Sequence, residues 1–197
     1  MLSLPINDQL KNLLSWQQSV FCMALSEHTK LHFHLFCEAI ENEAGTKINN
    51  EIDKFNQLFW EKMTVKGVKV NLTIQQEHFD EIIPDSRKHD FYGVYPAIDH
   101  CVILSCAFNS FLIKSNDEAL NASQTSFSTI ASFIELQSGD ELDDEMLQEQ
   151  ALFIEQLEFQ TELLKMLDNE RSPELIKSIQ HFVQAHGVTN LGIALSE

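Results

Sequence analysis

The chain has 197 residues, of which 44% are apolar, and a formal net charge of −17. This length and composition are typical of one globular domain and exclude a disordered chain. No Pro-, Gly- or Ser-rich linker and no internal repeat divides the sequence, so we expect a single domain over residues 1–197. No apolar run approaches the roughly 20 residues that a membrane span needs, and no signal-peptide pattern is visible. We therefore expect a soluble cytoplasmic protein without membrane association.

The negative charge is concentrated in the second part of the chain. Residues 1–114 contain 14 acids and 10 bases (net −4), whereas residues 115–197 contain 16 acids and three bases (net −13). Such a surface repels phosphate groups, so we expect no nucleic-acid binding. The charge suits a basic protein partner, or it only keeps the protein soluble. Self-association is compatible with either alternative.

Apolar residues at helical spacing indicate helices along the first third of the chain. Residues 7–25 and 29–44 predict two helices, and Gly45 is a typical stop for the second. Thr46 can cap a third helix. The inward face of that third helix is predicted to consist of Ile48, Ile52, Phe55, Phe59 and Met63.

The segment between the third helix and Pro84 contains two further signals. Residues 64–72 alternate apolar and polar side chains around Gly67, which indicates a short extended stretch or hairpin. Thr73 and Gln76 form a capping box for a short helix that ends before Pro84.

The most apolar stretch predicts a central helix at about 96–114. Twelve of the 18 residues from 97 to 114 are apolar, and they cover nearly all sides of a helical wheel. Such a helix has to be surrounded by other elements, and Phe108 lies on its apolar stripe. Pro96 fits the first turn, where its missing N–H costs nothing. Gly93 can adopt backbone angles that are closed to other residues in the preceding turn.

The second part of the chain predicts three more helices. Ser115 and Glu118 form a capping box for a helix that Gly139 ends. A long helix follows at about 143–168, after an acidic loop whose carboxylates suit the positive end of a helix dipole.

The C-terminal region has clear boundaries. Ser172 and Pro173 start a last helix, Gly187 ends it, and residues 188–195 look extended. The whole pattern predicts an all-α, single-domain bundle of seven or eight helices around the central helix.

We expect the four cysteines to be reduced, buried side chains, since none forms a CxxC pair: Cys22, Cys37, Cys101 and Cys106.

Four short motifs resemble a known family. They are Ser15-Trp16-Gln17, Thr64-Val65-Lys66 with Lys69-Val70-Asn71, Tyr92-Gly93-Val94-Tyr95-Pro96-Ala97-Ile98-Asp99, and Asn190-Leu191-Gly192-Ile193. With them, essentially the whole chain resembles the YjaG-like family of uncharacterised bacterial proteins, a domain-of-unknown-function family. The resemblance implies an all-helical cytoplasmic protein. It carries over no catalytic residue, because the family has no established activity.

The start of the central helix contains the strongest candidate site. The chain has 14 Phe but only two Tyr, Tyr92 and Tyr95, and both precede Asp99 and His100. Because this sequence uses Phe where an apolar ring suffices, the two hydroxyls are expected to matter. These four residues are candidates for a ligand-binding or catalytic corner. Alternatively, the hydroxyls satisfy buried backbone groups and Asp99 faces the helix dipole.

His28 and His32 are weak candidates for a metal site, because imidazoles four residues apart share one face of a continuous helix. They straddle the expected break between the first two helices, so we interpret them as surface histidines. The chain has no HExxH, no Glu-x-x-His, no phosphate loop and no GxSxG motif. We therefore expect no metal and no cofactor, and favour a non-enzymatic, acidic protein-interaction module. The alternative is a small-molecule-binding or enzymatic bundle that uses the tyrosine corner.

Overall fold

The computed structural model describes residues 1–40, 43–113 and 117–194, with the backbone alone at residues 43–46. The described part is helical and contains no strand, which confirms the predicted all-α class. The helices are α1 (Asn7–Lys11), α2 (Ser15–Ala39), α3 (Glu43–Thr64), α4 (Leu72–Asp80), the short 3-10 helix η1 (Ser86–Lys88), α5 (Val94–Leu112), α6 (Glu118–Ser138), α7 (Asp144–Gln148), α8 (Ala151–Leu167) and α9 (Pro173–His186).

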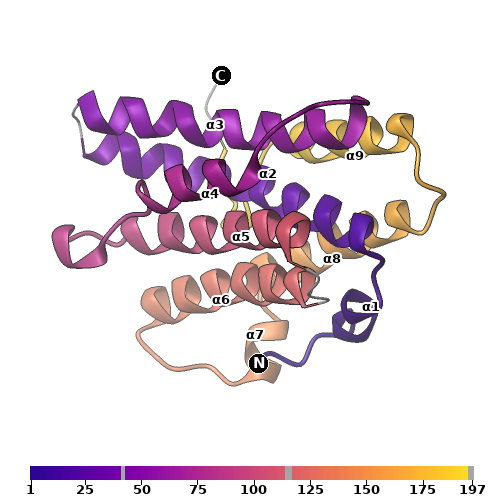
Figure 1. Cartoon of the computed structure of the whole chain (residues 1–197). Helices are drawn as coiled ribbons and strands as arrows, with labels where there is room; N and C mark the ends of the chain where they lie inside the picture. The colour runs from indigo at the N-terminus through magenta and orange to yellow at the C-terminus, as the bar shows by residue number, and fades with distance from the viewer. Residues whose placement is uncertain (41–42, 114–116, 195–197) are drawn as a thin grey trace.

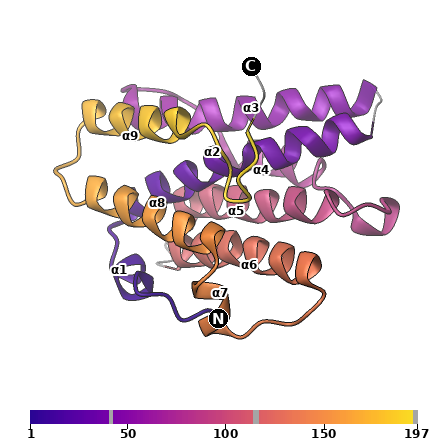
Figure 2. The ribbon, with the colours of Figure 1, turned by 180° about the vertical axis from the view of Figure 1, so that it is seen from behind.

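Helix α2 is the element that the other helices surround. It contacts α3, α5, α6, α8 and α9, and 16 of its 25 residues are buried. Figure 1 shows α2 and α5 in the middle of the bundle, with α3 and α9 at one edge and α6 and α7 at the other. The reverse view in Figure 2 shows the same order and places the C-terminal tail across α2.

The prediction of two helices at 7–25 and 29–44 is wrong. The chain forms a short α1 and then the continuous helix α2. The polar residues Ser26 and His28 lie at the predicted break, but both find partners on other helices: Ser26 Oγ donates to Asn56 Oδ1 at 2.9 Å, and His28 Nε2 lies 3.0 Å from Gln156 Oε1. Because α2 contains neither Gly nor Pro, nothing in the backbone interrupts it.

Helix α3 begins earlier than predicted. Its first residue is Glu43, so Gly45 and Thr46 lie inside the helix rather than at a boundary. The predicted apolar face is confirmed, since Ile52 and the phenylalanines on it are at most 1% exposed. Residues 64–72 form no strand. Thr64 ends α3, Leu72 begins α4, and the residues between them connect the two helices.

Two predicted caps also change. Helix α4 is capped by Asn71, whose side-chain oxygen accepts the N–H groups of Thr73 and Ile74, so Thr73 is not the cap. Ser115, the predicted cap of α6, lies outside the described residues; α6 itself ends at Gly139 in the left-handed conformation, with φ of 78°, as predicted.

Helix α5 packs between α2, α4 and α6. Phe108 is fully buried, as predicted, and its ring centroid lies 5.6, 4.8 and 5.5 Å from those of Phe55, Phe59 and Phe79. However, Val102 is 42% exposed, so α5 is not surrounded on every side. Gly93 has an ordinary φ of −57°, and Pro96 is the third residue of the helix. The expected special backbone angles at Gly93 are therefore absent.

The predicted long helix at 143–168 is two helices, α7 and α8. Asp143 caps α7 by accepting the N–H of Met146 at 2.9 Å. Helix α9 starts as predicted, because Ser172 Oγ accepts the N–H of Leu175 at 3.0 Å, and it ends at Gly187. Separating α7 from α8 brings the described α-helices to nine, against the predicted seven or eight.

The C-terminal tail is a tight loop rather than an extended segment. The N–H of Thr189 donates to Ile193 O, and the N–H of Gly192 donates to Thr189 O, both at 2.9 Å. Asn190 Nδ2 donates to Ser126 O at 2.9 Å and thereby ties the loop to α6. Thr189 and Asn190 are buried although they lie in a terminal segment.

The four cysteines are free and buried, as predicted. Burial raises the pKa of the Cys37 and Cys106 thiols to about 12, which keeps both protonated at neutral pH. No helix in the described ranges is long and apolar enough to cross a membrane.

Candidate functional site

The two tyrosines lie near each other at the start of α5, with ring centroids 6.2 Å apart. Tyr95 is 55% exposed, so its side chain does not satisfy a buried group as the sequence suggested. Tyr92 is half-buried, and burial together with the nearby Asp99 carboxylate raises the pKa of its hydroxyl. The tyrosines therefore lie on the surface side of the helix start.

Asp99 and His100 have partners on different helices. Asp99 accepts a hydrogen bond from Thr129 Oγ1 of α6 at 2.8 Å and lines a groove of about 630 Å³ between α5 and α6. His100 is fully buried on the opposite side, where Nδ1 lies 3.0 Å from Thr29 Oγ1 of α2. The structure does not bring the four sequence candidates together into one pocket.

His28 and His32 are interior residues, so the interpretation as surface histidines is wrong. They are 5% and 3% exposed, and the continuous α2 places them one turn apart on the same face. His32 Nε2 lies 2.9 Å from Thr189 Oγ1 in the C-terminal loop. The sequence could not show this pairing, because the two residues are 157 positions apart.

His28 begins a chain of buried hydrogen bonds that joins α2, α8, α6 and the C-terminal loop. Gln156 Nε2 donates to Ser126 Oγ at 3.0 Å, so Gln156 turns its Oε1 toward His28. Asn190 Nδ2 donates to the same Ser126 Oγ at 3.1 Å. Because His28 Nε2 faces the acceptor Gln156 Oε1, the neutral ring carries its proton on Nε2. The lone pair is then on Nδ1.

The Nδ1 atom of His28 is buried and makes no hydrogen bond with any described residue. The ring itself is held by stacking on Phe159, at a centroid distance of 4.1 Å and an interplanar angle of 14°, and by an edge contact with His186 at 5.1 Å. A buried polar atom without a partner is rare in native proteins. It therefore marks a place where a bound molecule or water completes the structure.

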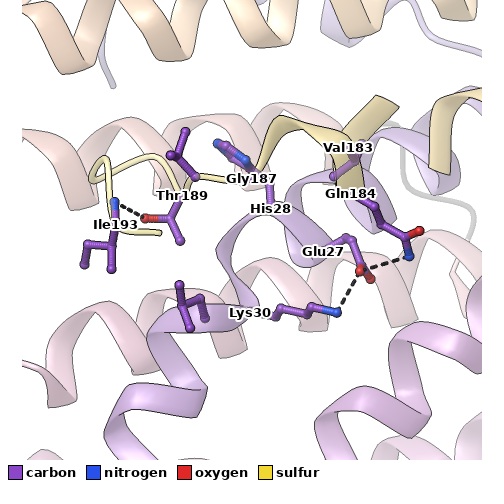
Figure 3. A pocket seen from close by; sticks show the side chains of 10 residues that line it. Glu27, His28, Lys30, Val183, Gln184, Gly187, Thr189 and Ile193 are labelled. Carbon is purple, nitrogen blue, oxygen red and sulfur yellow. Dashed lines mark hydrogen bonds and ion pairs between the residues drawn. The ribbon is translucent and has the colours of Figure 1, made fainter. Parts of the chain in front are cut away.

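A pocket of about 420 Å³ lies beside His28, and we call it the His28 pocket (Figure 3). Its wall comes from the middle of α2, the last turn of α9 and the C-terminal loop. Aliphatic side chains cover much of it, namely Leu31, Val183, Val188 and Ile193; its polar residues are Glu27, His28, Lys30, Gln184 and Thr189.

Glu27 is the buried charge of the His28 pocket. Its side chain is 5% exposed, and Oε1 accepts hydrogen bonds from Lys30 Nζ at 2.7 Å and from Gln184 Nε2 at 3.3 Å, as Figure 3 shows. The last turn of α9 adds the negative end of a helix dipole. The pocket thus combines a paired carboxylate, a helix C-terminus and a bare imidazole nitrogen, which together favour a hydrogen-bond donor.

The histidines of this region are neutral at physiological pH. Burial lowers the pKa of His28 to about 3 and that of His32 to about 4, and it also lowers the pKa of His186. Neutral imidazoles are good acceptors and good metal ligands. However, the described part of the chain contains no group of three or more His, Cys, Asp or Glu residues that could hold a metal ion.

Sequence reasoning did not find most of this site. Gln156, Ser126 and Asn190 look like ordinary polar residues, and only their burial in the fold identifies them as partners of His28. The one available signal was the motif Asn190-Leu191-Gly192-Ile193, because it places a polar Asn among apolar residues. In the structure Asn190 binds Ser126 of α6, which also accepts from Gln156, the partner of His28.

Comparison with known proteins finds relatives along the whole chain. Residues 5–194 match a family described as "Protein of unknown function (DUF416)". The uncharacterized protein YjaG is 37% identical in Salmonella typhimurium over 196 residues, 98% of each chain, and 36% identical in Escherichia coli over 200 residues, all of each chain. A crystal structure of a DUF416 family protein from Shewanella baltica superimposes with a TM-score of 0.86 at 25% identity, covering 98% of this chain and 100% of that one. The chain therefore belongs to the DUF416 family of uncharacterised proteins.

Proposed function

We propose that this protein binds a small aliphatic amine in the His28 pocket. The proposal is carried by His28, whose side chain lines a pocket of about 420 Å³ and whose buried Nδ1 has no partner among the described residues. An amine N–H would donate to this lone pair. Its hydrocarbon part would bury against the aliphatic wall, with a gain of roughly 0.8 kcal/mol per CH₂ group.

The electrostatics of the pocket favour an amine over an acid. An anion would meet the Glu27 carboxylate and the C-terminal end of α9, and both repel it. Lys30, paired with Glu27 at 2.7 Å, offsets the charge of that carboxylate, so the selectivity comes from the C-terminal end of α9 and from the His28 lone pair, to which a carboxylate has no proton to donate. A carboxylic acid of the same length should therefore bind much more weakly than the amine.

Thermal unfolding with added ligand tests the proposal. We expect n-butylamine and n-hexylamine, but not butanoate or hexanoate, to raise the melting temperature. If Kd is about 1 mM, 10 mM amine stabilises the fold by about 1.4 kcal/mol, a shift of about 3–6 °C for a chain of this size. His28→Phe keeps an aromatic ring but lacks Nδ1 and should lose the shift, whereas the exposed control His181→Phe should keep it. Equal shifts with amines and acids, or an unchanged shift in His28→Phe, would refute the proposal.

A second candidate function is the binding of a basic protein by the acidic surface of α7, α8 and their flanking loops. Between residues 140 and 174, all twelve Asp and Glu residues are exposed, against only two bases, Lys165 and Arg171. Met146 and Ile154, which are 52% and 44% exposed, add apolar area to the same region. A basic partner with apolar side chains would complement both features.

Affinity capture at low and high salt tests this second candidate. Two baits are compared, the wild-type protein and a variant in which the exposed residues Glu155, Glu158 and Glu162 are changed to Gln. A true partner should bind the wild type at low salt, leave it at high salt and bind the variant less. If no partner appears at low salt, or if the variant captures it equally well, this function is excluded.

A further inference from the structure

A second pocket, of about 260 Å³, adjoins the His28 pocket between α2, α3 and α9. We call it the Trp60 pocket. Asn56 and Trp60 of α3 line it, and their spacing of four residues places them on the same face of that helix. Glu27 and Lys30 of α2 are shared with the His28 pocket, and Asp53 lies on its α3 side.

Two buried donors of the Trp60 pocket have no acceptor. Asn56 and Trp60 are each 3% exposed, and neither Asn56 Nδ2 nor Trp60 Nε1 hydrogen-bonds to a described residue. Asn56 Oδ1 accepts from Ser26 Oγ at 2.9 Å, so Nδ2 is directed away from Ser26. A buried donor without an acceptor destabilises the fold, so a molecule that supplies an acceptor here recovers that free energy.

The charges around the pocket restrict which acceptor fits. Two carboxylates, Glu27 and Asp53, face one ammonium group, that of Lys30, at 2.7 and 3.7 Å. Asp53 also has the His34 ring at 3.3 Å, and the pocket keeps a formal excess of one negative charge when that ring is neutral. An anionic acceptor is disfavoured by this excess. The same carboxylates can accept hydrogen bonds from N–H groups of a ligand.

We propose that the Trp60 pocket binds a small uncharged molecule through a carboxamide or ureido group. The ligand's carbonyl oxygen accepts from Asn56 Nδ2 and Trp60 Nε1, and its N–H groups donate to Glu27 or Asp53. An amide carries a carbonyl acceptor and an N–H donor two bonds apart. A carboxylate, an alcohol or an amine lacks this combination. This site is separate from the amine site, because it uses donors on α3 that do not line the His28 pocket.

Proton–nitrogen NMR of the full chain gives a direct readout, because the protein has only two tryptophans, Trp16 and Trp60. The two indole N–H peaks are assigned with Trp16→Phe and then followed during titration with acetamide and with its anionic isostere acetate. We expect the Trp60 indole proton to move downfield and to saturate with acetamide, while Trp16 shows no saturable shift. Acetate should produce no saturable shift of either peak.

Variants then show which side chains contribute to acetamide binding. Trp60→Phe keeps the ring and removes one donor, so acetamide binding, followed on the Asn56 side-chain amide peaks, should weaken about five-fold, the effect of one hydrogen bond. Trp16→Phe should leave it unchanged. His28→Phe should also leave it unchanged, which keeps this site distinguishable from the amine site.

Two results of the wild-type titration overturn the proposal without any variant. If acetamide moves both indole peaks linearly with concentration, the donors are satisfied by water alone. If acetate saturates the Trp60 peak at the same concentration as acetamide, the pocket does not select an uncharged group and the assigned ligand class is wrong.

Discussion

Mild acid should destabilise this protein through its buried histidines. The folded pKa values of His28 and His32 are about 3 and about 4, against an ordinary value of 6.5 that the unfolded chain recovers. Between these values the unfolded state binds protons that the folded state does not. Stability is therefore complete above pH 6.5 and falls as the pH falls toward the folded pKa values. At pH 5 the loss relative to pH 7 is about 2 kcal/mol for each of the two residues.

His100 adds to the same effect, because its burial also lowers its pKa well below 6.5. Asp99 opposes it, since burial raises the pKa of that carboxyl and the folded state takes up a proton more readily. A combined loss of about 4 kcal/mol or more from His28, His32 and His100 is a large fraction of the 5–15 kcal/mol that typically holds a domain together. The protein should therefore lose much of its stability at pH 5, where carboxyl groups with ordinary pKa values are still ionised.

Urea unfolding at pH 7 and pH 5 measures this loss. His32→Gln removes one titrating group, so its difference between the two pH values should be about 2 kcal/mol smaller than that of the wild type. The exposed His181→Gln is the matched control and should retain the wild-type difference. A wild-type loss below 1 kcal/mol, or a His32→Gln variant that loses as much as the wild type, would show that these histidines do not remain neutral in the folded state.

Three further predictions concern stability and are checked by chemical or thermal unfolding. Phe108→Ala should cost about 3–5 kcal/mol because its ring is enclosed by three other phenylalanines, whereas Val102→Ala on the exposed side of α5 should cost less than half of that; similar losses in both would show that this cluster is not the tight part of the core. Tyr95→Phe should change stability by less than about 0.5 kcal/mol because the side chain is 55% exposed, and a larger loss would mean that its hydroxyl has a buried partner. Asn190→Ala should cost about 1–3 kcal/mol, since it removes both hydrogen bonds to Ser126, and an unchanged melting temperature would show that the C-terminal loop is not anchored there.

Elements with strong local signals could be predicted from the sequence. Helix α9 has Ser172 and Pro173 at its start and Gly187 at its end, and each acts locally, so the prediction needed no tertiary information. The apolar spacing from Ile52 to Met63 identified the buried face of α3 for the same reason. Phe108 was found because Leu104, Phe111 and Leu112 lie three or four residues from it and share its side of the helix.

Boundaries that depend on distant partners could not be predicted. Ser26 and His28 interrupt the apolar pattern of α2, and only Asn56 and Gln156, on α3 and α8, make them compatible with a buried helix. In the opposite sense, Glu149 and Gln150 separate α7 from α8 without any Gly or Pro, so the helical pattern runs through the break. The candidate pocket was missed for the same reason, since its polar residues come from segments far apart in the chain.

The anchoring of the C-terminal loop also has a consequence for the order of folding. The contact of His32 with Thr189 and the bond of Glu27 with Gln184 each close a loop of 157 residues, among the longest that this chain can form. Such closures carry the largest entropy cost and follow the formation of local helices. Until they form, the histidines of α2 remain open to water and take up protons below pH 6.5. Refolding in mild acid is then slowed at its last step, the docking of the chain terminus, even where the finished fold is still the more stable state.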